Sequence, residues 1–324
     1  MATVTKKGIN RTESEKLLNV SKAGHYQNRA DKLFTKERES EEDSGLVYIP
    51  PVFAQLYLPQ RAITSHTWIV ENPNFCLTVS TSERRQIPYG CFPRLFLAYI
   101  STEIIRKGTI EIDLGNSQAE LLNRLGFYNT GRHIELFNRS VADLFSSQFE
   151  LQIKNPQATK QKKLQGDIYY FKLASRLLLW EHSLDGKKTE WTKKLYINKD
   201  FFNYVTRKRG IPINYHRLAN LCKSALAMDL YVWLLYRLYI LQRSRNQHCL
   251  LTFEELKQQF QPNSSQSSFH FKAKFLNCLS MVLPLLPDFQ DCILLSDDKK
   301  HLMLIKPKKS VEAVLKKDNE STLL

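Results

Sequence analysis

The stretch DLYVWLLYRLYILQR, residues 229–243, is the most hydrophobic part of this 324-residue chain. A helix that spans a membrane needs about 20 nearly uninterrupted apolar residues. Here Asp229 and Arg237 enclose only the seven uncharged positions 230–236. The stretch is therefore predicted to be the core helix of a folded domain. It begins near Ser224, and its two charged residues are expected closer to its ends than to its centre.

A short succession of elements follows this helix. The pattern predicts a strand in CLLT (249–252) and a short helix in TFEELKQQF (252–260), where Thr252 and Glu255 form a capping box. A longer helix is predicted over 266–283. The segment DCILLSDDKKHLMLIKP (291–307) then alternates as expected for a hairpin with a polar tip.

The first half of the chain has the same order. A helix opens after Pro93 and stops at Gly108, and TIEIDL (109–114) predicts a strand. The short helix 117–127 and a second helix over 129–145 follow. The segments 149–153 and 167–180 alternate like the strands of a hairpin, with a long basic tip at 154–166.

Two copies of one element order, about 130 residues apart, predict an α+β fold with two tandem winged helix-turn-helix domains. The expected division is a disordered arm (1–45), an N-terminal winged-helix domain (46–195), a C-terminal winged-helix domain (196–308) and a flexible tail (309–324). The arm mixes charges of both signs with few apolar residues, which is typical of disorder.

The chain carries 47 Lys and Arg against 32 Asp and Glu, a net charge of +15. The excess is concentrated, because residues 154–217 hold 15 basic and five acidic side chains. Such a surface favours polyanions, so nucleic acid and an anionic membrane surface are both candidate partners. The N-terminus lacks the apolar core of a signal peptide, and a cytoplasmic, nucleoid- or plasmid-associated protein is expected.

The patterns of enzyme chemistry are weak. The six cysteines include no C-x-x-C pair, the eight histidines no H-x-H pair, and GFYNTGRH (126–133) lacks the lysine of a phosphate loop. Glu111 and Asp113 lie on one face of a strand and could hold Mg²⁺, as in a primase-like enzyme. Because these motifs are weak or incomplete, the sequence predicts a protein that is not an enzyme and that has no catalytic residues, metal or cofactor.

The two longer helices combine an apolar stripe with a polar face. Ile134, Phe137, Val141 and Leu144 form the stripe of the first, and Phe271, Phe275, Cys278 and Val282 that of the second. The polar faces suit the edges of bases in the major groove of DNA. The predicted base-reading residues are Thr130, Arg132, Asn138 and Arg139 in the first half and Ser268, His270, Lys274 and Asn277 in the second.

Basic clusters beside strand and helix ends are candidate contacts to phosphates. The predicted phosphate-contacting residues are Lys160, Lys162, Lys163, Lys187, Lys188, Lys193, Lys194, Arg207, Lys208 and Arg209. A merely solvated loop is the alternative interpretation of each cluster.

The stretches IPYGCFPRLFLAYISTE (87–103), INKDFFNYV (197–205) and MDLYVWLLYRL (228–238), together with FHFKAKFLNCLSMVLPLLP (269–287), resemble the RepA family of plasmid replication initiators. The resemblance covers about residues 87–307 and is carried by PYG, PRL and the DLYVW segment. It implies a protein that binds repeated sequences (iterons) in double-stranded origin DNA and promotes opening of an AT-rich region.

The resemblance also implies recruitment of the host initiator DnaA and the replicative helicase. A second copy of the chain, forming a homodimer, is a further candidate partner, and no membrane is expected. The alternative function is a winged-helix transcriptional repressor, since such initiators also repress their own promoters. The recognised DNA sequence does not follow from the resemblance.

Overall fold

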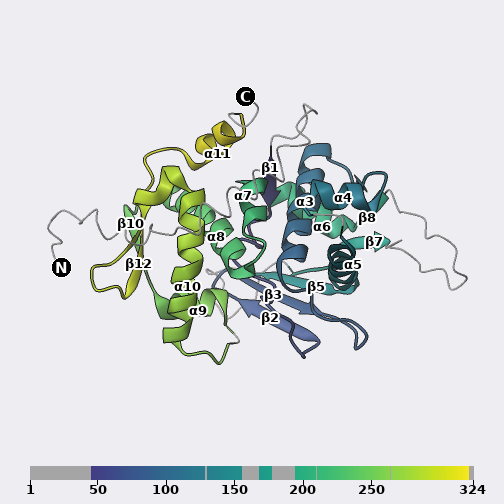
Figure 1. Ribbon diagram of the computed structural model, residues 1–324, viewed down its shortest axis with the longest axis horizontal. Helices are drawn as coiled ribbons and strands as arrows, with labels where there is room; N and C mark the ends of the chain where they lie inside the picture. The colour runs from purple at the N-terminus through teal and green to yellow at the C-terminus, as the bar shows by residue number, and fades with distance from the viewer. Residues whose placement is uncertain are drawn as a thin grey trace, which may run out of the picture.

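The computed structural model describes residues 45–127, 130–154, 168–176, 194–208, 210–262 and 264–320. It is a mixed fold of helices and small antiparallel sheets (Figure 1). The helices are α3 (Cys91–Lys107), α4 (Gln118–Arg124), α5 (Gly131–Ser146), α6 (Lys199–Lys208), α7 (Tyr215–Asn220), α8 (Ala225–Arg243), α9 (Phe253–Phe260), α10 (Ser268–Val282) and α11 (Val311–Glu320), with 3₁₀ turns η2 (Leu283–Leu285) and η3 (Pro287–Cys292).

Within the described residues, the strands form four sheets. They are β1 (Leu46–Ile49) with β9 (Ile211–Asn214), then β2 (Thr67–Glu71), β3 (Phe75–Ser80), β5 (Gln148–Ile153) and β6 (Ile168–Phe171), then β4 (Glu111–Asp113), β8 (Lys194–Ile197) and β7 (Ala174–Arg176), and β10 (His248–Thr252), β12 (His301–Ile305) and β11 (Ile293–Leu295).

The apolar stretch 229–243 forms most of helix α8. The hydroxyl of Ser224 caps it by accepting the backbone N–H of Ala227 at 3.2 Å. Positions 225–235 are buried throughout, and α10, α7, α11, β9 and β12 pack around the helix. Within the described residues, no helix is both long and apolar enough to cross a bilayer.

The two predicted successions of elements are present. The first runs α3, β4, α4, α5, β5 and β6, and the second runs α8, β10, α9, α10, β11 and β12. Several predicted ends are confirmed: Gly108 ends α3 with φ 62°, Thr130 caps α5, and Thr252 and Glu255 form the capping box of α9. In Figure 1, α3 and α5 lie in one half of the molecule, and α8 and α10 in the other.

The strand pairing differs between the two halves. In the second half, β10 joins the hairpin β11–β12 to make one sheet. In the first half, β4 pairs with β8 instead of the β5–β6 hairpin. The hairpin β5–β6 instead joins β2 and β3 in one sheet, where β3 pairs with β5 along six residues. The tandem winged arrangement therefore stays a prediction, while the mixed helix-and-sheet fold is established.

Residues on both sides of the predicted domain boundary contact the first half. Strand β8 pairs with β4, α6 packs on α3, and β9 pairs with β1. Gly210, just before β9, lies so close to the chain that an added Cβ would meet the Cβ of Tyr48 at 2.6 Å. The division into domains at residue 195 stays a prediction.

The C-terminal segment differs from the expected flexible tail. Residues 311–320 form helix α11, which contacts α8, β1 and β9. Val311 and Leu315 are four residues apart and both buried, so they form one apolar stripe on this short helix. That stripe explains why the segment folds back onto the protein.

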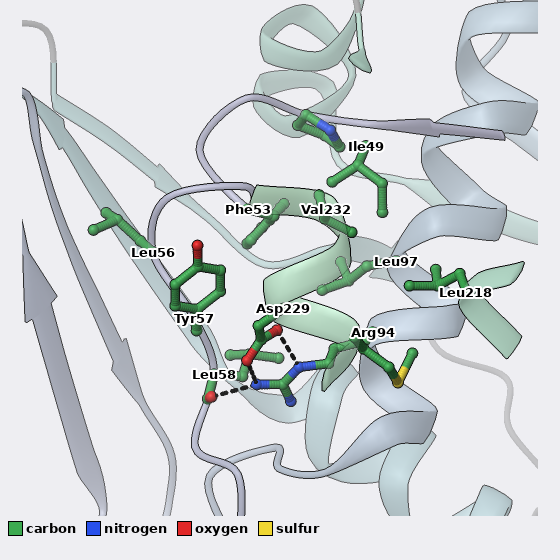
Figure 2. A pocket seen from close by; sticks show the side chains of 12 residues that line it. Ile49, Phe53, Leu56, Tyr57, Leu58, Arg94, Leu97, Leu218, Asp229 and Val232 are labelled. Carbon is green, nitrogen blue, oxygen red and sulfur yellow. Dashed lines mark hydrogen bonds and ion pairs between the residues drawn. The ribbon is translucent and has the colours of Figure 1, made fainter. Parts of the chain in front are cut away.

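A buried ion pair lies at the junction of the two halves (Figure 2). Arg94 of α3 donates to both carboxylate oxygens of Asp229 of α8, at 2.6 Å and 2.8 Å. Its remaining three N–H groups donate to the carbonyls of Leu58 at 2.7 Å, Gly90 at 2.6 Å and Pro59 at 3.4 Å. All five N–H groups of the guanidinium thus have an acceptor, which is the condition under which a charge can be buried.

The charge of each partner acts on the other. Burial acts to lower the pKa of Arg94, but Asp229 and its hydrogen bonds raise that pKa above the ordinary value. Burial raises the pKa of Asp229, and Arg94 opposes that rise. Burial and the guanidinium thus act in opposite directions on the pKa of this carboxyl group. The bidentate contact to a permanently protonated guanidinium favours the ionised pair at neutral pH.

The pocket beside this pair, drawn in Figure 2, has a free volume of about 30 Å³. That is the room of about one water molecule, far below the volume of sites for organic ligands. Around it, Tyr57 stacks on Phe260 with ring centroids 5.1 Å apart, and Trp233 meets Phe260 at 5.3 Å. The junction is a packed interface and not a ligand site.

Candidate nucleic-acid interface

Helix α5 presents the polar face that the sequence predicts. Phe137, Val141 and Leu144 are buried, whereas Arg132 and Arg139 are exposed. The buried residues recur at three- and four-residue spacing, so the arginines point away from the core. Thr130 stands at the start of this helix, where its hydroxyl accepts the N–H of His133 at 3.4 Å and therefore acts as a cap.

Two of the predicted base-reading side chains of α5 have protein partners. Asn138 is half-buried, and its amide oxygen accepts a hydrogen bond from the side chain of Gln118 on α4. Arg139 donates to the side-chain oxygen of Gln86 at 2.8 Å. These contacts hold both side chains in place, and Arg132 is exposed in the first turn of the helix.

Helix α10 also divides as predicted. Phe271, Phe275, Cys278 and Val282 are buried. On the other side, His270 and Asn277 are exposed. Ser267 caps the helix, and its hydroxyl lies 2.7 Å from Nδ1 of His270.

Lys274 and Ser268 of α10 are half-buried rather than fully exposed. The ammonium of Lys274 donates to the side-chain oxygen of Gln60 at 2.7 Å, and Gln261 donates to the same oxygen at 2.8 Å. Lys274 therefore holds α10 against the segment that follows residue 59. Burial lowers its pKa, and the nearby charge of Arg61 lowers that pKa further.

Phe269 belongs to this surface and was not predicted from the sequence. It lies in the first turn of α10, and 77% of its surface is exposed. A helical projection could have found it, because Phe269 and the buried Phe271 are about 200° apart around the helix axis. The alternation SFHF hides this, since the two phenylalanines resemble one strand face.

Most of the predicted phosphate contacts lie outside the described residues: Lys160, Lys162, Lys163, Lys187, Lys188, Lys193 and Arg209. Among the others, Arg207 and Lys208 are exposed in the last turn of α6. The Nζ of Lys194 lies 2.6 Å from a carboxylate oxygen of Glu111 on the neighbouring strand. A phosphate would have to compete with that carboxylate for Lys194.

The same contact bears on the possible Mg²⁺ site at Glu111 and Asp113. The hydrogen bond from Lys194 lowers the pKa of Glu111 and neutralises the charge that a cation would need. In the part of the chain that the structure describes, no three His, Cys, Asp or Glu side chains gather to hold a metal ion. The six cysteines are free thiols, and burial raises the pKa of Cys91 to about 12.

Two helices with exposed polar faces, in a chain of net charge +15, are typical of nucleic-acid-binding proteins. Residues 87–254, just over half of the chain, match the family described as plasmid encoded RepA protein. This chain belongs to that family of plasmid replication initiators. The match includes α3, α5 and α8 and ends at the start of α9, so α10 lies beyond it.

The solved structures that are similar to this chain include two crystal structures of domains 2 and 3 of RctB. One, of selenomethionine derivatives, has a TM-score of 0.49 and 13% identity and covers 81% of this chain and all of the other. The second, of RctB residues 155–483, has a TM-score of 0.43 and 12% identity and covers 83% of this chain and all of the other. No curated protein matches the sequence.

Proposed function

We propose that this protein starts plasmid replication by binding iterons in double-stranded origin DNA, with α5 and α10 in successive major grooves. Bound protein promotes opening of the adjacent AT-rich region and recruits host replication proteins, DnaA and the helicase among them. The observation that carries the proposal is the exposed face of α10. His270 and Asn277 face outward from a helix whose opposite side is fully buried.

The surroundings of α10 support a winged helix-turn-helix in the second half. Helices α9 and α10 follow the core helix α8, and the hairpin β11–β12 comes after them in one sheet with β10. The tip of that hairpin carries Lys299 and Lys300 next to Asp297 and Asp298, and the backbone carbonyl of Lys299 accepts a hydrogen bond from Lys272 of α10. A wing held beside a reading helix places cations where phosphates flank the groove.

The first half is proposed to bind DNA in the same way through α5, although β4 pairs outside its hairpin. The protein acts without catalysis, as a binding and assembly factor. The second candidate function is transcriptional repression, which needs the same reading faces but no opening of DNA.

A replication assay separates the two. A replicon is built from a selectable marker, the gene and its flanking DNA, and it is introduced into a host that cannot otherwise maintain it. A matched replicon with an early stop codon is the control. Colonies from the intact gene alone support initiation. Equal failure of both replicons, with promoter repression retained, assigns the protein to repression instead.

A further inference from the structure

A basic concavity lies beside the outer face of α5. Its volume is about 490 Å³, and three segments line it: residues 62–66, residues 83–86 and Arg139 of α5. The cations in its wall are Arg84, Arg85 and Arg139, against the single carboxylate of Glu83. All three arginines are exposed.

Contacts beneath the concavity fix its shape. The buried carboxylate of Asp143 lies 4.0 Å from the guanidinium of Arg85 and accepts the backbone N–H of Gln86 at 3.4 Å. The side-chain oxygen of Gln86 in turn accepts a hydrogen bond from the guanidinium of Arg139. The strand pair β2–β3 connects the segments 62–66 and 83–86, and at its open end the backbone N–H of Thr81 donates to the carbonyl of His66 at 3.0 Å. These contacts hold the backbone that bears the arginines in a defined position.

A short piece of chain links the concavity to the surface around α10. Its first lining residue, Ala62, follows Arg61 and Gln60, and Gln60 is the residue that accepts from Lys274. In Figure 1, β2 and β3 lie between α9 and α5. Arg139 and Arg84 line the concavity, Arg61 directly precedes its first lining residue, and the charge of Arg61 acts on Lys274 of α10.

These cations are under-compensated. Neither Arg61 nor Arg84 has a carboxylate within ion-pair distance among the described residues. Like charges that gather without counter-charges favour an anionic ligand, and guanidinium groups match phosphate oxygens in a bidentate manner.

We infer that this concavity holds the phosphate backbone of duplex DNA where it passes between the two reading helices. The inference rests on the proposed function. A duplex that presents one major groove to α5 and the next to α10 must cross the protein between them, and the crossing strand is read only through its phosphates. Arg61 and Arg84 are then phosphate contacts that do not depend on base sequence.

The test measures how salt weakens binding of the full chain to a mixed-sequence duplex of about 40 base pairs, or four helical turns. The variant is R61Q/R84Q, which changes two exposed side chains. The matched control is R245Q, another exposed arginine, which lies at the far end of α8 from the junction. Thermal unfolding of the three proteins checks that the fold is unchanged.

Each phosphate contact contributes about 0.9 to the slope of log K against log salt. The double variant is expected to lose about 2 from the slope of the wild type, and R245Q to lose nothing. Equal slopes for the wild type and R61Q/R84Q, or an equal loss in R245Q, would overturn the inference. Absence of duplex binding by the wild type would instead contradict the proposed function itself.

Two further binding experiments distinguish DNA from other ligands that carry phosphate groups. Phosphatidylserine vesicles and ATP are offered to the same three proteins. If R61Q/R84Q loses vesicle or ATP binding while its DNA slope stays that of the wild type, the concavity serves a lipid surface or a nucleotide, and the inference fails. The inference is supported if R61Q/R84Q shows the reduced salt slope for DNA and the wild type binds neither the vesicles nor ATP.

Discussion

Arg94 and Asp229 stand 135 residues apart in the chain and form a bidentate ion pair in the protein interior. Arg94 belongs to the PRL stretch and Asp229 to the DLYVW stretch, two of the segments that carry the family resemblance. Both side chains are almost fully buried, with 9% and 6% of their surface exposed. The pair therefore fixes α3 against α8 at the junction of the two halves.

Removing one partner of this pair is expected to destabilise the protein strongly. The variants R94M and D229L each leave a buried charge without its counter-charge, which costs about 3–5 kcal/mol of the free energy of unfolding. The double variant R94M/D229L should lose clearly less than the sum of the two. Urea denaturation followed by circular dichroism measures this, and single losses below about 1 kcal/mol would contradict a structural role.

The capping box of α9 predicts a dependence of stability on pH. Hydrogen bonds from the backbone and side chain of Thr252 lower the pKa of Glu255. Because the folded-state pKa lies below the unfolded one, the contribution of Glu255 is present above the unfolded value of about 4.3 and is lost as pH falls through the folded value. At pH 7, T252A should lose about 1 kcal/mol.

The matched variant for this prediction is E255Q, which keeps the shape of the side chain but not its charge. Unfolding of the wild type, T252A and E255Q is compared at pH 7 and at pH 3. The difference between wild type and E255Q should shrink at pH 3. A difference that grows on acidification would show that the sign of the argument is wrong.

Local features of this fold are predictable from the sequence, and long-range contacts are not. The caps at Thr130, Ser224 and Thr252, the end of α3 at Gly108 and the burial of α8 all follow from local spacing. The pairing of β4 with β8 and the contact between Arg94 and Asp229 do not. Local patterns say which side of an element is apolar, and they carry no information on which distant segment covers it.

The candidate site shows the same division. The inward and outward faces of α5 and α10 are predictable from helical periodicity. The partners of Arg139 and Lys274 are not, because Gln86 and Gln60 lie 53 and 214 residues away from them. The basic concavity was missed for this reason: its wall comes from three segments that are separate in the sequence.

Phe269 should contact a thymine methyl group. An aromatic ring exposed in the first turn of a reading helix suits apolar contact in the major groove. Replacing single thymines of a bound repeat with uracil should weaken wild-type binding at one position by about 0.8 kcal/mol, the effect of one buried methyl group. F269A should be insensitive to that replacement and should unfold like the wild type. Equal sensitivity of both proteins at every thymine would remove Phe269 from the interface.

Base reading and phosphate contact should separate between Asn277 and Lys208. N277A is expected to lose about 1–3 kcal/mol against a bound repeat and little against random DNA. K208A should weaken both by about the same factor and reduce the salt slope by roughly one. K274A is less informative, because it also removes the hydrogen bond from Lys274 to Gln60 that holds α10 in place. Equal losses of N277A on repeat and random DNA would transfer base reading to α5.

The most direct test of the central claim is a nuclease footprint of the full chain on the DNA that flanks its gene. The account predicts protection of direct repeats, each about two helical turns long, beside an AT-rich tract. Protection should survive a large excess of random duplex in the wild type and disappear in a variant that combines R132A with N277A. Uniform protection without repeats, or none at any salt concentration, would contradict sequence-specific origin binding.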